Sequence, residues 1–237
     1  MRTWNNEYSG RISTTQILEK SSNVGMVKII EKIKKKSVNE YLNKLGFREK
    51  TGIEIQGETT GIVKDSSQWY PIDYATLSFG QGIAITPIQL VAAFSSLAND
   101  GYVVKPTVIE NITDSSGKKV YTSSTLNKRT VYSPKTVTIM KKMLNAAIEN
   151  SEAPYPQKPA GYSFCGKTGT AQIPIEGHYD PTKTIASFIG FFPCDKPKVL
   201  IFVMYKEPSG SIWGSETAAP TFFEIANRLI LYYNIAP

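Results

Sequence analysis

The chain has 237 residues, of which 41% are hydrophobic and 20% charged, and its formal net charge is +7. This length and composition fit one globular domain with a true core and exclude a disordered chain. The positive charge does not indicate a nucleic-acid partner, because the lysines are scattered and no basic stripe is interleaved with aromatic residues. The densest basic run, Lys32–Lys36, is interpreted as a solvated helix face.

The first hundred residues are predicted to be largely helical. Apolar spacing and turn residues predict helices at residues 14–20, 23–33, 37–46 and 87–100. Residues that favour helix starts precede or open three of these segments: Ser13 or Thr14, a capping box of Ser37 and Glu40, and Thr86-Pro87. Residues 47–85 are rich in Gly, Ser and Thr, and we expect irregular structure there.

The second half is predicted to contain most of the strands. A hairpin is expected from strands at 103–112 and 119–122 with a turn at Asp114–Gly117, followed by a helix that Ser133-Pro134 caps and that runs to about residue 150. Three strand candidates follow, at 162–173, 184–192 and 198–206, and a last helix starts near Ala219. Early helices and late consecutive strands predict an α+β fold, with helices packed on an antiparallel sheet.

The segment Gly161–Thr168 spells G-x-x-x-x-G-K-T, a formal match to the phosphate-binding P-loop. A P-loop requires a buried strand before the turn and a helix after it. Residues 151–159 contain three prolines, and Gly169, Pro174 and Gly177 interrupt any following helix. Residues 162–173 instead alternate like a strand, so we expect no nucleotide to bind.

The composition gives little support for a metal site, a cofactor site or catalysis by histidine. The chain has two cysteines, Cys165 and Cys194, without metal-ligand spacing, and we interpret them as two buried thiols rather than a disulfide. The single histidine, His178, is expected in a surface loop, which leaves Ser-His-Asp catalysis unsupported. No apolar run reaches the ~18 residues of a membrane span, and the first residues lack a signal-peptide layout.

The lysine of the P-loop spelling, Lys167, also belongs to a second and more specific motif. Lys167-Thr168-Gly169 spells the K-T-G element of serine acyl-transferases that react with penicillin. Far upstream, Ser21-Ser22-Asn23 forms an S-x-N element at a predicted helix junction. Such a hydroxyl and amide from the helical side can face a strand-borne lysine and threonine across a cleft. The two elements in this order point to one acyl-transfer site.

With both elements in place, the chain resembles the class B penicillin-binding proteins, the monofunctional transpeptidases of septal and lateral wall synthesis. The resemblance covers essentially residues 1–237, as part of a single transpeptidase domain with the penicillin-binding, β-lactamase-like fold. Beyond Ser21–Asn23, the segments that carry it are Trp4–Asn6, Lys50–Ile53, Ser78–Gly82, Thr86–Leu90, Lys167–Gln172, Ser187–Phe191 and Ala218–Pro220.

The resemblance implies a mechanism and a set of site residues. A serine is acylated by a D-alanyl-D-alanine stem peptide, and the acyl group passes to an amine on a neighbouring strand; β-lactams mimic the donor. Catalytic roles fall to Ser21 (proton relay), Asn23 (orientation of substrate and base) and Lys167 (positive charge and proton movement). Substrate-binding roles fall to Ser22, Thr168, Gly169 and Thr170, whose backbone N–H is an expected oxyanion donor.

The family places its nucleophile in S-x-x-K, well before the S-x-N element. Two such spellings occur, Ser115–Lys118 and Ser116–Lys119, but both lie in the predicted hairpin turn, where an exposed lysine stays charged at neutral pH. We therefore predict that the chain is the C-terminal part of a transpeptidase domain and is inactive by itself. In the full-length parent, the resemblance implies the extracytoplasmic face of the bacterial membrane, with divisome or elongasome partners.

Two other functions remain open from the sequence. One is a non-catalytic penicillin-binding-like module that binds wall peptide or a division partner. The other is a β-lactam sensor or a class D-like β-lactamase. The presence of Ser21, Asn23, Lys167, Thr168 and Thr170 together argues against a pure scaffold, and the segment 78–90 fits the transpeptidases better.

Overall fold

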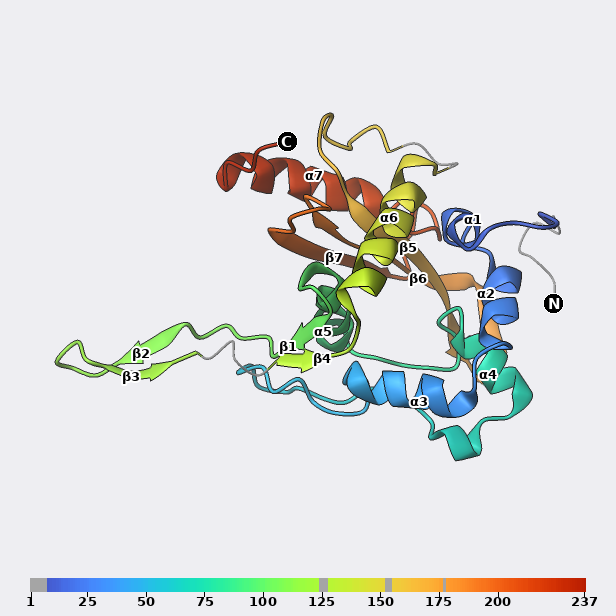
Figure 1. Ribbon diagram of the computed structural model, residues 1–237, viewed down its shortest axis with the longest axis horizontal. Helices are drawn as coiled ribbons and strands as arrows, with labels where there is room; N and C mark the ends of the chain where they lie inside the picture. Colours follow the sequence, from blue (N-terminus) through green and yellow to red (C-terminus); the bar gives the residue numbers. More distant parts are fainter. Residues whose placement is uncertain (1–7, 124–127, 152–154, 177) are drawn as a thin grey trace. The chain divides into compact units, whose positions relative to one another are not determined.

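The computed structural model describes residues 8–123, 128–151, 155–176 and 178–237, and its elements are drawn in Figure 1. The chain divides into two compact units. The sheet unit joins residues 1–29, 78–80 and 138–237, and the second unit joins residues 30–77 and 81–137. The family segment Trp4–Asn6 lies outside the described residues.

The sheet unit is built on three antiparallel strands in the order β5-β6-β7. Their bounds are β5 (Cys165–Ile175), β6 (His178–Phe192) and β7 (Val199–Lys206). All three predicted strands and the α+β class are confirmed. β6 begins earlier than the predicted 184 because Pro174 still pairs with Tyr179, which carries the ladder almost to the turn. β5 is an edge strand, so every second backbone N–H faces away from β6.

An aromatic core fixes this sheet. α7 (Ala218–Tyr232) lies against the sheet, as Figure 1 shows. Phe222 and Phe223 of α7 are fully buried together with Phe188 and Phe192 of β6 and with Phe164. The ring centroids of Phe188 and Phe222 are 4.4 Å apart. Burial of each such side chain contributes roughly 2–3 kcal/mol, so β6, the neighbour of β5, is firmly held.

Three helices complete the sheet unit, and their starts follow the sequence. They are α1 (Thr14–Glu19), α2 (Asn23–Ile30) and α6 (Pro134–Glu149), although Ile30 and the first four residues of α6 belong to the second unit. Ser13 caps α1 in a reciprocal capping box with Gln16, and Ser133 Oγ accepts the Thr136 N–H at the start of α6. α2 ends at Ile30, three residues before the predicted end.

The second unit is mostly helical and carries two small sheets. Its elements are α3 (Lys35–Lys44), a 3₁₀ turn at Ser66–Gln68, α4 (Pro71–Leu77), α5 (Pro87–Ala98), β1 (Tyr102–Val104), β2 (Asn111–Thr113), β3 (Lys119–Thr122) and β4 (Lys128–Thr130). Its largest core cluster gathers Ile30, Leu42, Phe47, Trp69, Tyr74 and Ala93. Thr86 caps α5, as predicted, and Gln89 completes a capping box with it.

Two predictions for this unit are wrong. α3 begins at Lys35 with no side-chain cap, so Ser37 and Glu40 do not form a capping box. The segment 47–85, predicted to be irregular, contains α4 and the 3₁₀ turn. Helical segments of three to seven residues span too few turns to show an apolar period that would distinguish them from a loop.

The predicted strand at 103–112 is also wrong. It is two separate strands: β1 pairs with β4, and β2 pairs with β3. Pro106 lies between them, and proline cannot donate to a ladder. The hairpin turn at Asp114–Gly117 is confirmed, because the Asp114 carboxylate accepts the backbone N–H groups of Ser116 and Lys118. In the part of the chain that the structure describes, no helix is both long and apolar enough to cross a bilayer.

Candidate functional site

The K-T-G element lies inside β5 rather than at the start of a helix. Lys167 pairs with Ile189 and Thr168 pairs with Phe188 of β6. β5 continues to Ile175, so the residues after Lys167 form a strand. A phosphate cradle needs helix N-terminal amides at this point, and this geometry does not provide them.

Lys167 is held close to Thr168. Its ammonium Nζ donates to Thr168 Oγ1 at 3.1 Å and to the Thr168 carbonyl oxygen at 3.3 Å. Among the described residues, no carboxylate forms an ion pair with it. Burial lowers the pKa of Lys167 to about 8. A lysine in this state is a cation near neutral pH that releases its proton readily, which suits both anion binding and proton movement.

A cavity of about 130 Å³ brings the helical side of the site next to this lysine. Ser21, from the α1–α2 junction, lines the cavity together with Lys167 and Thr168. The remaining lining residues come from α1, its C-cap, α6, the start of β5 and the loops that follow α6 and β7, and include Glu19, Lys20, Ile148, Ser151, Tyr155, Gly166 and Ser215. All of these residues belong to the sheet unit. The predicted meeting of the first serine of S-x-N with K-T-G is therefore present.

Ser21 also has an unusual backbone. Its φ is +48°, in the left-handed region that costs a non-glycine residue roughly 1 kcal/mol. Such conformations persist where the surrounding structure fixes them, and they cluster at functional sites. The left-handed backbone of Ser21 is therefore a second observation, besides its place in the cavity, that is consistent with a functional position.

The other two residues of the S-x-N element have a visible structural role. Ser22 Oγ accepts the Gly25 N–H at 3.2 Å, which caps α2. Asn23 is the first residue of α2. Neither residue lines the cavity beside Lys167. The structure thus brings Ser21, Lys167 and Thr168 to one cavity, and Ser22 and Asn23 lie next to Ser21 in the chain but outside the cavity lining.

Gly169 and Thr170 continue the strand beyond the cavity lining. Gly169 lies opposite Ser187, and a Cβ at Gly169 would come within 2.6 Å of Ser187 Oγ. Thr170 Oγ1 accepts the Gly214 N–H at 3.1 Å. Gly214 and Ser215 are site residues that the sequence analysis missed. The nearest family segment in the sequence is Ala218–Pro220, which begins after two intervening residues.

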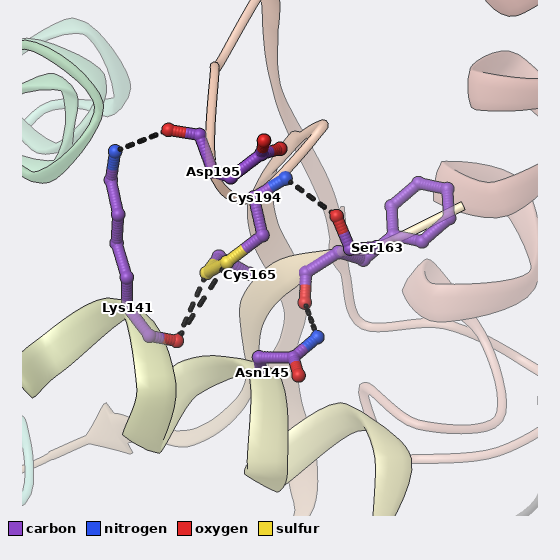
Figure 2. The surroundings of a disulfide bond; sticks show 7 residues. Lys141, Asn145, Ser163, Cys165, Cys194 and Asp195 are labelled. Carbon is purple, nitrogen blue, oxygen red and sulfur yellow. Dashed lines mark hydrogen bonds between the residues drawn. A yellow bond between two sulfur atoms is a disulfide. The ribbon is translucent and has the colours of Figure 1, made fainter. Parts of the chain in front are cut away.

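A disulfide lies just upstream of Lys167. Cys165 and Cys194 are joined, so their interpretation as two free thiols is wrong. Figure 2 shows both sulfur atoms beside the Lys141 carbonyl oxygen of α6, at 3.1 and 3.7 Å. A disulfide carries no S–H, so these are contacts and not hydrogen bonds. The bridge ties the start of β5 to the loop that follows β6.

The neighbourhood of the disulfide is also held by polar contacts. Asn145 Nδ2 donates to the Phe164 carbonyl oxygen at 2.9 Å, and the Cys194 N–H donates to Ser163 (Figure 2). Lys141 Nζ donates to the Asp195 carbonyl oxygen at 3.2 Å. α6 is thereby attached to the residues immediately before Lys167 and to those after β6.

The two S-x-x-K spellings lie in an exposed turn and not in a cavity like that of Lys167. Ser115, Ser116, Lys118 and Lys119 are all exposed, in and beside the β2–β3 turn. Ser116 Oγ donates to the Asp114 carboxylate, which also accepts the Lys118 backbone N–H. Ser116 stabilises the turn, and the lysines of both spellings are exposed, unlike the desolvated lysine that activates a nucleophilic serine.

A larger cavity of about 360 Å³ lies in the second unit, among residues of α5, β1 and β4, the loop after α3 and the residues that follow β1. It contains none of the predicted site residues. Within the described ranges, no group of three or more His, Cys, Asp and Glu side chains is arranged to hold a metal ion.

Comparisons with known proteins agree with the motifs. The penicillin-binding protein transpeptidase domain family matches residues 1–227. Stage V sporulation protein D of Bacillus subtilis is 36% identical over 225 residues, which cover 93% of this chain and 34% of that protein. Penicillin-binding protein PbpB of Mycolicibacterium smegmatis is 31% identical over 233 residues, covering 94% of this chain and 36% of that protein.

Solved structures show the same fold. Penicillin-binding protein 3 of Mycobacterium tuberculosis, crystallised with aztreonam, superposes with a TM-score of 0.86 at 30% identity, covering 95% of this chain and 53% of that one. The transpeptidase domain of Burkholderia pseudomallei penicillin-binding protein 3 gives 0.83 at 26% identity, covering 98% and 68%. The chain spans about a third of the length of the curated relatives named above. By its family match, its fold and its two motifs, the chain belongs to the penicillin-binding protein transpeptidase domain family.

Proposed function

We propose that the chain supplies the substrate-binding wall of a peptidoglycan D,D-transpeptidase site that β-lactams also occupy. The observation that carries this proposal is the cavity in which Ser21 lies beside the half-buried Lys167 and Thr168. The complexes of Mycobacterium tuberculosis penicillin-binding protein 3 with aztreonam and ampicillin support a β-lactam ligand for this fold.

The proposed reaction is an acyl transfer in two halves. A serine oxygen attacks the carbonyl between the two D-alanines, and the terminal D-alanine leaves with a proton on its nitrogen. An amine of a second stem peptide then attacks the ester, and the serine recovers its proton. The Lys167 ammonium and the hydroxyls of Thr168 and Thr170 bind the terminal carboxylate, and Ser21 passes the proton to the leaving amine.

The remaining family residues take supporting roles. Asn23 orients the substrate and the general base. Ser22 and Gly169 shape the substrate side, the first by fixing the start of α2 and the second by keeping β5 close to Ser187. The Thr170 N–H is the proposed oxyanion donor, and losing one such donor typically costs about 3 kcal/mol of transition-state stabilisation.

We further propose that the nucleophile comes from an S-x-x-K segment upstream of residue 1 in a longer parent protein. The exposed position of both S-x-x-K spellings within the chain supports this proposal, as does the partial coverage of the relatives. The parent would act at the extracytoplasmic face of the bacterial membrane, with divisome or elongasome proteins as partners. A disulfide in the chain fits such an oxidising location.

Intact-mass spectrometry after treatment with benzylpenicillin tests both proposals. The 237-residue chain alone should gain no covalent adduct, whereas the chain extended by the translated upstream segment should gain one. Lys167→Met in the extended protein should slow acylation strongly, and Lys118→Met, in the exposed turn, should not. An adduct on a serine of the unextended chain would contradict the external nucleophile. An extended protein that binds stem peptide without being acylated would instead be a non-catalytic module.

A further inference from the structure

The segment Ile212–Ser215 lies within the loop between β7 and α7. It is called here the β7–α7 segment and is fastened beside β5. Buried Thr184 of β6 donates its hydroxyl to the Ile212 carbonyl oxygen at 2.8 Å. Thr217 Oγ1 donates to the Trp213 carbonyl oxygen at 2.8 Å. The Ala219 N–H donates to the Gly214 carbonyl oxygen at 2.9 Å. Because it is tied to β6 and to the start of α7, this segment holds a fixed position.

Gly214 is the residue of the β7–α7 segment that lies against the backbone of both β5 and β6. A Cβ at Gly214 would lie 2.4 Å from the Gly169 carbonyl oxygen and 2.5 Å from the Ser187 carbonyl oxygen. Both are backbone atoms of paired strands and cannot turn aside. The φ of Gly214 is outside the left-handed region, so glycine is required here for space and not for backbone freedom.

This close approach sets the hydrogen bond to Thr170. The Gly214 N–H donates to Thr170 Oγ1 at 3.1 Å. A hydroxyl has one hydrogen to donate and two lone pairs that accept. With one lone pair taken by Gly214, the Thr170 O–H is turned away from the segment and is available to donate. A carboxylate only accepts hydrogen bonds, so this orientation is the one that a carboxylate ligand needs.

We propose that Gly214 is a positioning residue for the ligand carboxylate: its N–H orients the Thr170 hydroxyl, and its missing side chain lets the segment come close enough to do so. The inference rests on the proposed function. Ser215, next in the chain, lines the cavity that contains Lys167, so the same segment closes one side of the ligand site.

The test measures binding of two peptides to the ¹⁵N-labelled 237-residue chain by NMR. One peptide ends in D-alanyl-D-alanine with a free carboxylate, and the other is its C-terminal amide. Gly214→Ala should weaken carboxylate binding by about tenfold or more, the loss expected for a hydrogen bond to a charged group. It should leave the weaker amide binding nearly unchanged. Gly210→Ala is the matched control, because a Cβ at Gly210 meets nothing within 4 Å.

Equal affinity of wild type and folded Gly214→Ala for the carboxylate peptide would overturn the inference alone. A wild-type chain that does not distinguish the two peptides would overturn the proposed function, and the inference with it. If Gly214→Ala does not fold, the inference is tested instead by the chemical shift of the Gly214 amide in wild type and in two Thr170 variants. Carboxylate peptide should shift this resonance in wild type and in Thr170→Ser but not in Thr170→Val, and the same shift in all three would overturn the inference.

Discussion

The strand pair β5–β6 and the hairpin β2–β3 are both antiparallel, and both carry lysine motifs typical of penicillin-reactive enzymes. They differ in what lies behind them. β6 rests on a fully buried aromatic core, whereas the residues of β3 are all exposed. In the first pair the lysine loses water, and its pKa falls to about 8; in the hairpin Lys118 and Lys119 lie at the surface. A lysine in such a motif therefore has a lowered pKa only where the packing of the fold excludes water from its side chain.

The largest difference between the two regions should appear in stability. Phe222→Ala removes a ring that is fully buried among other phenylalanines, and should cost about 3–5 kcal/mol of unfolding free energy. Val120→Ala in β3, where the side chain is 61% exposed, should change it by less than about 0.5 kcal/mol. Urea unfolding of both variants gives the comparison. Similar costs for the two would mean that the core does not distinguish the regions.

The disulfide should add the next largest contribution on the β5–β6 side. Cys165 and Cys194 are separated by 29 residues, and closing a loop of that length stabilises by roughly 3–4 kcal/mol in the chain-entropy treatment. Reduction with dithiothreitol should lower the urea midpoint of the wild type accordingly. The Cys165→Ala/Cys194→Ala double variant is the control, and reductant should not move its midpoint. An unchanged wild-type midpoint would show that the bridge contributes little.

The sheet and α7 were predictable from sequence because alternation in residues 162–173, the short apolar runs of β6 and β7 and the helical spacing after Ala219 are local patterns. The buried face of α7 was not, because it contains Phe223 and Ala226, whereas Ile225 and Tyr233, at helical spacing from Phe222, are exposed. The pairing of β1 with β4 was not predictable either. It joins Tyr102–Val104 to Lys128–Thr130 across a long excursion, and each strand is too short to show a period of its own. Distant pairings of this kind depend on the rest of the fold, not on local pattern.

The residues of the candidate site also fall into those that the sequence could predict and those that it could not. Ser21 and Lys167 were predictable because their motifs are local in sequence, and the structure brings them to one cavity. Gly214 and Ser215 were not, because they reach β5 only when the β7–α7 segment folds back over the strands. The pairing of Cys165 with Cys194 likewise depends on two chain segments meeting, which the spacing of cysteines cannot reveal.

The pKa of Lys167 makes a prediction about pH. Below about pH 8 the lysine is an ammonium that attracts a ligand carboxylate, and above it the charge is lost. The affinity of the chain for a D-alanyl-D-alanine peptide should therefore fall as pH rises through 8, by about tenfold or more. Calorimetric titration between pH 6.5 and 9.5 measures this fall.

Two variants sharpen the pH comparison between the regions. Lys167→Met should bind weakly and with no pH dependence in this range, whereas Lys118→Met in the hairpin should behave as the wild type. A wild-type affinity that stays constant across pH 8 would show that the Lys167 charge does not contribute to binding. A pH dependence that persists in Lys167→Met would assign the titration to another group.

The smallest effect concerns one left-handed residue in each region, Ser21 at φ +48° in the site and Gly117 at φ +84° in the hairpin turn. Glycine adopts this conformation freely and serine does not, so Ser21→Gly should raise the unfolding free energy by roughly 1 kcal/mol. Ser21→Ala keeps the strained backbone and should not. Gly117→Ala should lower stability by a similar amount, because it introduces a Cβ where the turn needs glycine.

Both Ser21 variants lose the hydroxyl, so both should lose the proposed proton relay equally. A stability gain in Ser21→Gly without any gain in function would show that the site holds a strained serine for its chemistry. Equal stability of Ser21→Gly and Ser21→Ala, measured from their urea midpoints, would mean that the left-handed backbone at Ser21 carries no cost. The hairpin glycine would then be the only one of the two positions where the conformation constrains the residue type.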